Sequence, residues 1–217
     1  MIYTFFEYFL FFLFYSFIGW ALEVIQGLVI RKKFVNRGFL IGPCCPIYGY
    51  GVLLITFLLN DFMFSPISVF LLSMIICMVL EYITSYFMEV FFKARWWDYS
   101  DKKFNINGRV CLETGIPFGL GGAIIMYVVN PFVMSIINKI NPTLLVIIGS
   151  ILLIIYIIDN IISFSTIIKI DKINLKEYKD NTEEITKRVK EHLKKHSLFT
   201  KRLLNAFPNM IMTIKKK

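Results

Sequence analysis

Five apolar stretches occur in the sequence, and each is long enough for a helix that crosses the hydrocarbon core of a bilayer, which is about 30 Å thick. They occupy residues 5–30, 39–59, 66–92, 117–137 and 143–168. Only 18% of the residues are charged against 57% that are hydrophobic, so the polar surface is too small to dissolve a globular body of this size. We expect an all-α membrane protein with about five transmembrane helices.

The second stretch is the least regular of the five. Several glycines and prolines fall in it, at Gly42, Pro43, Pro46, Gly49 and Gly51. Because these residues weaken or interrupt a helix, we expect an irregular or re-entrant segment first, followed by a short helix from about Pro46.

The distribution of Lys and Arg predicts the orientation, because basic residues collect on the cytoplasmic side of a membrane. The first and third loops are basic, and residues 169–217 carry 14 of the 24 Lys and Arg. The second loop has no basic residue and the fourth has only Lys139. We expect a multi-pass protein of the cell membrane with its N-terminus outside. Residues 1–168 would form the transmembrane domain and residues 169–217 a basic cytoplasmic tail.

Apolar residues recur every three or four positions in this tail, among them Ile185, Val189, Leu193, Leu203 and Phe207. This period predicts an amphipathic helix that lies on the anionic inner leaflet, with a solvated charged helix as the alternative. We therefore expect membrane lipids, and no nucleic acid, as a partner.

An approximate repeat also runs through the chain. Leu22-Glu23 corresponds to Leu80-Glu81, and a set of later residues recurs 70 or 71 positions on: Phe34, Asn36, Gly38, Pro46, Gly49 and Gly51 match Phe104, Asn107, Gly108, Pro117, Gly119 and Gly121. The repeat predicts two helix hairpins of the same orientation, related by an axis along the membrane normal, with the fifth span added. Biased composition is the competing explanation.

Three acids, Glu23, Glu81 and Asp159, lie inside apolar stretches. At the centre of a spanning helix such a group costs about 2.5–3.5 kcal/mol unless it faces a partner or water. One interpretation is that they pair with loop arginines and hold helices together. The other is that they line a cavity open to the cytoplasm, and we favour this for Glu81, while both remain open for Asp159.

The second and fourth stretches begin on the predicted cytoplasmic side, where their free backbone N–H groups suit an anionic group. Arg37, Arg95 and Arg109 lie nearby in sequence and could complete an anion site with bidentate hydrogen bonds. The alternative is that the glycines only allow close helix packing and the prolines only start helices.

The third loop is the most unusual segment. Trp96 and Trp97 fit an interfacial anchor at the headgroup level, but that role does not explain Asp98, Asn107 and Arg109, which we expect to bind a polar headgroup or substrate. The full set of predicted ligand-binding residues is Glu23, Arg37, Glu81, Arg95, Trp96, Trp97, Asp98, Asn107, Arg109 and Glu113.

The sequence lacks the motifs of a cofactor or catalytic site. It has no nucleotide-binding P-loop and no nucleophile elbow, so we expect no ATPase or hydrolase activity in this chain and assign no catalytic residue. Four cysteines without C-x-x-C spacing, and no histidine in the spans, predict no metal site.

Several motifs in order resemble the CmpB family of bacterial membrane proteins, labelled as type IV permeases of ABC transporters. They read FVNRGFLIGPCCPIYG at residues 34–49, LEY at 80–82, RWWDY at 95–99 and NGR at 107–109. The resemblance covers about residue 12 to the end of the fourth span, with residues 202–208 similar as well. Cys45 beside Cys44 is the one departure. The resemblance implies a permease-like role without a defined substrate or established catalytic residues.

We therefore expect a permease-like protein that binds a polar, anionic or amphiphilic ligand in a cytoplasmic-facing intramembrane cavity. A homodimer or a separate ATPase subunit is expected as partner, because five spans are few for transport by one chain. One alternative is an enzyme acting on a lipid headgroup at the inner leaflet, with Glu81, Asp98 or Glu113 as acid or base. Another is a membrane scaffold.

Overall fold

The structure is a computed structural model that describes residues 2–32, 34–92, 94–171, 201–202, 205–206 and 211–212. Within this part the chain is an all-α membrane protein of about five helices, as the apolar stretches predict. Four helical segments are long and apolar enough to cross a bilayer: α1 (Ile2–Arg31), α3 (Pro66–Phe92), α6 (Pro142–Asp171), and a composite of α4 (Leu112–Ile124), the π-helical turn η2 (Ile125–Val129) and α5 (Asn130–Ile137).

Helix α2 (Pro46–Leu59) is shorter than the others. Its 14 residues span about 21 Å at 1.5 Å per residue, less than a hydrocarbon core. A 3-10 turn, η1 (Asn60–Phe62), extends it toward α3. Residues 34–45 precede α2 without helix or strand.

The fourth helix begins at Leu112, five residues before the start of the predicted span at Pro117. Proline lacks a backbone N–H, and at the sixth residue of the helix it removes one hydrogen bond of the second turn. The first turn is held in another way, because the Thr114 hydroxyl donates to the Cys111 carbonyl at 3.0 Å. Pro117 therefore lies inside the helix and does not mark its start.

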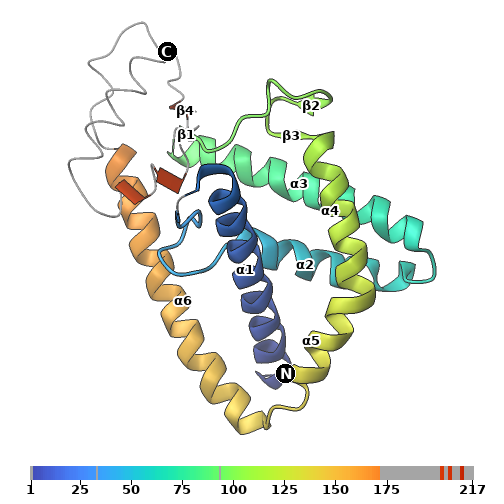
Figure 1. The fold of residues 1–217 in the computed structure, drawn as a ribbon. Helices are drawn as coiled ribbons and strands as arrows, with labels where there is room; N and C mark the ends of the chain where they lie inside the picture. Colours follow the sequence, from blue (N-terminus) through green and yellow to red (C-terminus); the bar gives the residue numbers. More distant parts are fainter. Residues whose placement is uncertain are drawn as a thin grey trace, which may run out of the picture.

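The helices form two neighbouring pairs, α1 with α2 and α3 with α4, and α6 packs along α1. The C-terminal ends of α1, α3 and α6 gather at one end of the bundle with the start of α4, while the N-terminus and the turn between α5 and α6 lie at the far end (Figure 1). We call the first end the loop end, because it carries the two long loops, residues 32–45 and 94–111.

Two apolar clusters hold the bundle together. One joins α1, α2, α5 and α6 around Phe11, and the other joins α2, α3 and the π turn around Ile55 and Val69. The outer face of α6 is a row of exposed isoleucines: Ile147, Ile151, Ile154, Ile158 and Ile161. An apolar surface of this extent is stable against lipid and not against water.

Short strands organise the loop end. Strand β2 (Asn105–Ile106) pairs antiparallel with β3 (Val110–Cys111) to make a hairpin in the third loop. Strand β1 (Ala94–Arg95) pairs antiparallel with β4 (Ile211–Met212), which brings the C-terminal segment to the same loop. The amphipathic tail helix predicted from Ile185 to Phe207 falls mainly on residues outside the described part of the chain, including the five apolar residues named for it.

Candidate functional site

Equivalent glycine contacts set the distance within each helix pair. A Cβ on Gly49 of α2 would lie 2.6 Å from the Phe12 backbone oxygen of α1, and a Cβ on Gly119 of α4 would lie 2.8 Å from the Phe70 backbone oxygen of α3. The two phenylalanines are 58 residues apart, which is also the spacing of the two acids in the predicted repeat, and the glycines are 70 apart. A duplicated helix hairpin would give this correspondence.

Glu23, on the loop-end half of α1, has partners on both carboxylate oxygens. The Tyr48 hydroxyl, from the first turn of α2, donates to Oε1 at 2.7 Å. The Arg37 guanidinium lies 3.3 Å from Oε2 and also donates to the Gln26 side chain at 3.0 Å. Glu23 is therefore paired as the structural interpretation predicted, and Arg37 is neutralised.

Glu81, the matching acid on α3, is only 7% exposed. The Tyr99 hydroxyl, from the third loop, donates to its Oε1 at 3.2 Å. Among the described residues, Oε2 is buried and has no hydrogen-bond partner. Burial and the nearby charges of Glu81 and Glu23 hold the pKa of Tyr99 well above its usual range, so both acids lie within electrostatic reach of one tyrosine.

Two charged side chains hold the non-helical segment that precedes α2. Asp159 of α6 accepts hydrogen bonds from the backbone N–H groups of Ile41 and Gly42, at 2.9 and 2.8 Å. From the C-terminal segment, the Arg202 guanidinium donates to three successive carbonyls, at Gly38 (3.0 Å), Phe39 (2.9 Å) and Leu40 (2.7 Å). Irregular backbone is tolerated near a membrane only when its polar groups are satisfied in this way.

Arg202 itself lies outside the spans, and its environment is partly buried. Burial lowers the pKa of the Arg202 guanidinium, while the Asp159 carboxylate acts in the opposite direction. Both side chains thus bind the backbone of residues 38–42, Arg202 its carbonyls and Asp159 its N–H groups.

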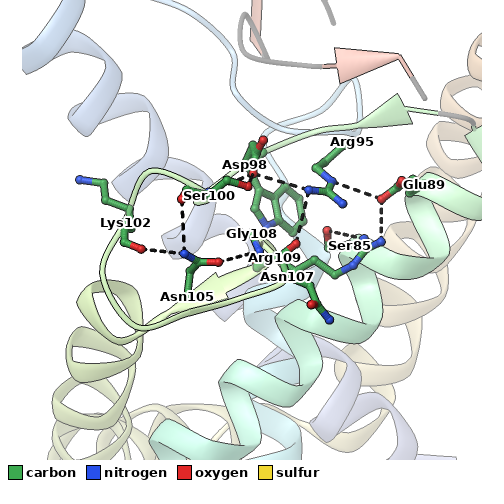
Figure 2. Close-up of polar contacts among 11 residues, drawn as sticks. Ser85, Glu89, Arg95, Asp98, Ser100, Lys102, Asn105, Asn107, Gly108 and Arg109 are labelled. Atoms are coloured by element: carbon green, nitrogen blue, oxygen red, sulfur yellow. Dashed lines mark hydrogen bonds and ion pairs between the residues drawn. The ribbon is translucent and has the colours of Figure 1, made fainter. Parts of the chain in front are cut away.

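The third loop holds an ion network that centres on Glu89 of α3 (Figure 2). One carboxylate oxygen, Oε2, receives Arg109 Nη2 at 2.7 Å and Arg95 Nε at 3.2 Å. Arg95 also lies 3.6 Å from Asp98, and Arg109 donates to Ser85 at 3.2 Å. Two arginines are balanced by two carboxylates, so the network has no net charge.

The turn at Asn107 and Gly108 locks this network to the hairpin. Both residues have positive φ, and Gly108 leaves no room for a side chain because a Cβ would collide with Asp98 and Ser100. The Asn107 amide donates to the Tyr82 hydroxyl at 2.9 Å. These contacts make the loop a compact structure built on α3.

Of the remaining predicted residues, Trp97 donates from its indole to the Arg109 carbonyl at 3.0 Å. Trp96 is 4% exposed and packs edge to face against Phe39, with ring centroids 6.0 Å apart. Glu113 is on the surface, 3.1 Å from Lys102. The three acids considered for headgroup chemistry therefore have different partners.

Sequence reasoning missed Tyr48, Tyr99, Glu89 and Arg202. Glu89 carried a usable signal, because it follows Glu81 by two steps of four residues and so lies on the same helical face. The tyrosines and Arg202 are joined to their partners by tertiary contacts, which leave no local pattern. Among the described residues no three His, Cys, Asp or Glu side chains are placed to hold a metal ion.

The model of the CmpB family, described as "Putative ABC-transporter type IV", matches residues 10–164, which includes both helix pairs and most of α6. No curated protein and no solved structure gives a significant match.

Proposed function

We propose that this chain is the membrane-spanning subunit of a transporter and that it binds a polar ligand at the loop end. The chain belongs to the CmpB family of ABC-transporter-related membrane proteins, and this membership is the premise of the proposal. The observation that carries this is Glu81. A carboxylate oxygen that is buried without a hydrogen-bond partner is costly, and functional sites are where such a cost is retained.

The position of Glu81 supports a site between the two helix pairs. Glu23 comes from the first pair and Glu81 from the second, and burial together with the negative charges of both acids raises the pKa of Tyr99. Binding between two repeated units is the usual arrangement in transporters built from repeats. Movement of one pair against the other would open and close the site.

The proposal also covers orientation and partners. The loop end would face the cytoplasm, because the two basic loops lie there and the basic residues 169–217 begin at the C-terminal end of α6, which also lies there. ATP would be bound by a separate subunit, since the sequence has no P-loop, and a homodimer would supply further spans. Residues 1–168 would form the membrane domain, and residues 169–217 a cytoplasmic tail beside anionic lipid.

Co-purification tests this function. The tagged full-length protein, extracted mildly from its native membrane, should retain a polar small molecule that mass spectrometry detects after denaturation, together with an ATPase subunit. Glu81→Gln should lose the small molecule and keep the subunit. The matched control is Asp61→Asn, because Asp61 is an exposed acid in η1 and this variant should keep both.

Two results would count against the proposal. If Glu81→Gln retained the same molecules as the wild type, Glu81 would not be part of a ligand site. If no ATPase accompanied any of the three proteins, the assignment to an ABC-type transporter would be wrong. A Glu81→Gln protein that failed to fold would indicate a structural role for the acid.

A further inference from the structure

The three arginines predicted to bind an anion, Arg37, Arg95 and Arg109, are already paired with carboxylates, which bears on the kind of ligand the site accepts. Arg37 is paired with Glu23. Arg95 and Arg109 share Glu89. An anionic ligand would have to displace a carboxylate from one of these guanidinium groups.

In the described part of the chain, Glu81 differs from these three arginines, because its hydrogen-bond partner is a neutral tyrosine. Within the described part of the chain, Glu81 has no ion pair and accepts one hydrogen bond, from the neutral Tyr99. The exposed acid at Glu113 is different, because it is solvated and has Lys102. A buried carboxylate requires either a proton or a positive partner, since neither water nor protein compensates its charge.

The surroundings of Glu81 favour a positive partner. Each of the two acids accepts a hydrogen bond from a tyrosine hydroxyl, Glu23 from Tyr48 at 2.7 Å and Glu81 from Tyr99 at 3.2 Å. Aromatic rings beside carboxylates are the chemistry that recognises protonated amines and quaternary ammonium groups, because ring faces and carboxylates both attract cations. Neither tyrosine offers an anion its hydroxyl proton, as each already donates to a carboxylate.

We propose that the ligand of this site carries an organic ammonium group, which binds beside the free carboxylate oxygen of Glu81. This inference rests on the proposed function, which requires only that some polar ligand binds there. It narrows the expectation of a polar or anionic ligand to a cationic one. The positive group lies against Glu81 Oε2, where its charge balances the buried carboxylate.

Three probes of similar shape and different charge test the inference with the full-length protein in nanodiscs. Choline is the cation, 3,3-dimethylbutan-1-ol is its neutral isostere and 3,3-dimethylbutanoate is an anion. Each is titrated at constant sodium chloride, and the melting temperature is followed by tryptophan fluorescence. Choline should stabilise the wild type with saturation, and the other two should not. Glu81→Gln should weaken choline binding at least about tenfold, because Gln keeps the shape of the side chain but removes the charge that attracts the cation.

The wild type alone provides a second readout that does not depend on a variant folding. If choline replaces a proton on Glu81, its apparent affinity rises with pH, by at most about tenfold per pH unit while the acid titrates. Asp61→Asn, at an exposed acid in η1 between α2 and α3, is the matched control and should behave as the wild type in both measurements.

The outcomes separate this inference from the proposed function. If the anion or the neutral isostere stabilised the wild type but not Glu81→Gln, the claim of a cationic ligand would be wrong. The proposed function would still hold, because it requires only that a polar ligand binds at Glu81. If sodium or potassium chloride alone raised the melting temperature equally, and in a way that depends on Glu81, the claim that the ligand carries an organic ammonium group would be wrong. If none of the probes, nor the small molecules of the native membrane extract, bound in a Glu81-dependent way, both the inference and the proposed function would fail.

Discussion

Asp159 holds the segment that leads into α2, so its replacement should loosen this segment more than the rest of the bundle. The wild-type carboxylate accepts two backbone N–H groups, from Ile41 and Gly42. Hydrogen bonds to charged groups contribute about 1.5–3 kcal/mol each. Asp159→Asn keeps the shape but has one acceptor oxygen and turns an NH₂ group toward the second N–H. We expect a loss of about 2–4 kcal/mol in the local stability of residues 38–45.

Hydrogen exchange in nanodiscs measures this loss directly. A loss of 2–4 kcal/mol corresponds to exchange that is faster by about thirty- to seven-hundredfold at the amides of Ile41 and Gly42, since 1.4 kcal/mol is a factor of ten. Asn160→Leu is the matched control on the same helix. The Asn160 amide bonds only to Tyr156 within α6 among the contacts of the described residues, so residues 38–45 should exchange as in the wild type.

Wild-type exchange rates in Asp159→Asn would refute the reasoning, because they would mean that the two hydrogen bonds contribute nothing to holding the segment. Equal acceleration in Asn160→Leu would refute it too. The effect would then come from a general loosening of α6.

Three further predictions concern helix packing, the ion network and alkaline pH. Gly119→Ala should lower the free energy of unfolding, measured by SDS titration, by about 1–3 kcal/mol, because the added Cβ meets the backbone of α3. Gly121→Ala, which has open space around it, should leave this free energy unchanged. Equal effects of the two substitutions would contradict the packing account. Arg109→Gln should lower the free energy of unfolding by about 1.5–3 kcal/mol in the same assay, because it removes a partly buried ion pair with Glu89. Lys102→Gln breaks an exposed ion pair and should lower it by less than about 1 kcal/mol. The reverse order would refute the claim that the network at Glu89 stabilises the fold. Because the pKa of Tyr99 is raised in the folded protein, its stabilising effect is complete below the unfolded value of about 10 and is lost as pH rises through the folded pKa. Tyr99→Phe should therefore leave the phenolate absorbance at pH 10 unchanged, and a loss of one phenolate would contradict this.

The helices were predictable because length and apolar character alone define a membrane span. Helix α3 begins at Pro66 and ends at Phe92, the limits of the third apolar stretch. The repeat spacing pointed to Gly49 and Gly119, which occupy equivalent contacts. The early start of α4 at Leu112 was missed because a proline was taken as a beginning, although a helix accepts one lost hydrogen bond.

The partners of the charged residues could not be predicted in the same way. Asp159 meets residues more than a hundred positions earlier, and Arg202 reaches still further back. Sequence reasoning identified Arg37 and Arg109 as charged groups near a helix start, but the choice between an external anion and an internal carboxylate depends on distances that the fold sets. In both cases the carboxylate lies within ion-pair distance.

The central claim is that Glu81 is a buried acid with one carboxylate oxygen held ready for a ligand, while Glu23 is fully engaged. This difference can be measured with dicyclohexylcarbodiimide, an apolar reagent that modifies carboxyl groups inside membranes. The wild-type protein is dialysed to remove bound small molecules and then labelled, and the modified peptides are mapped. The account predicts preferential labelling of Glu81, with Glu23 protected by Tyr48 and Arg37. Equal labelling of the two acids, or preferential labelling of Glu23, would contradict it.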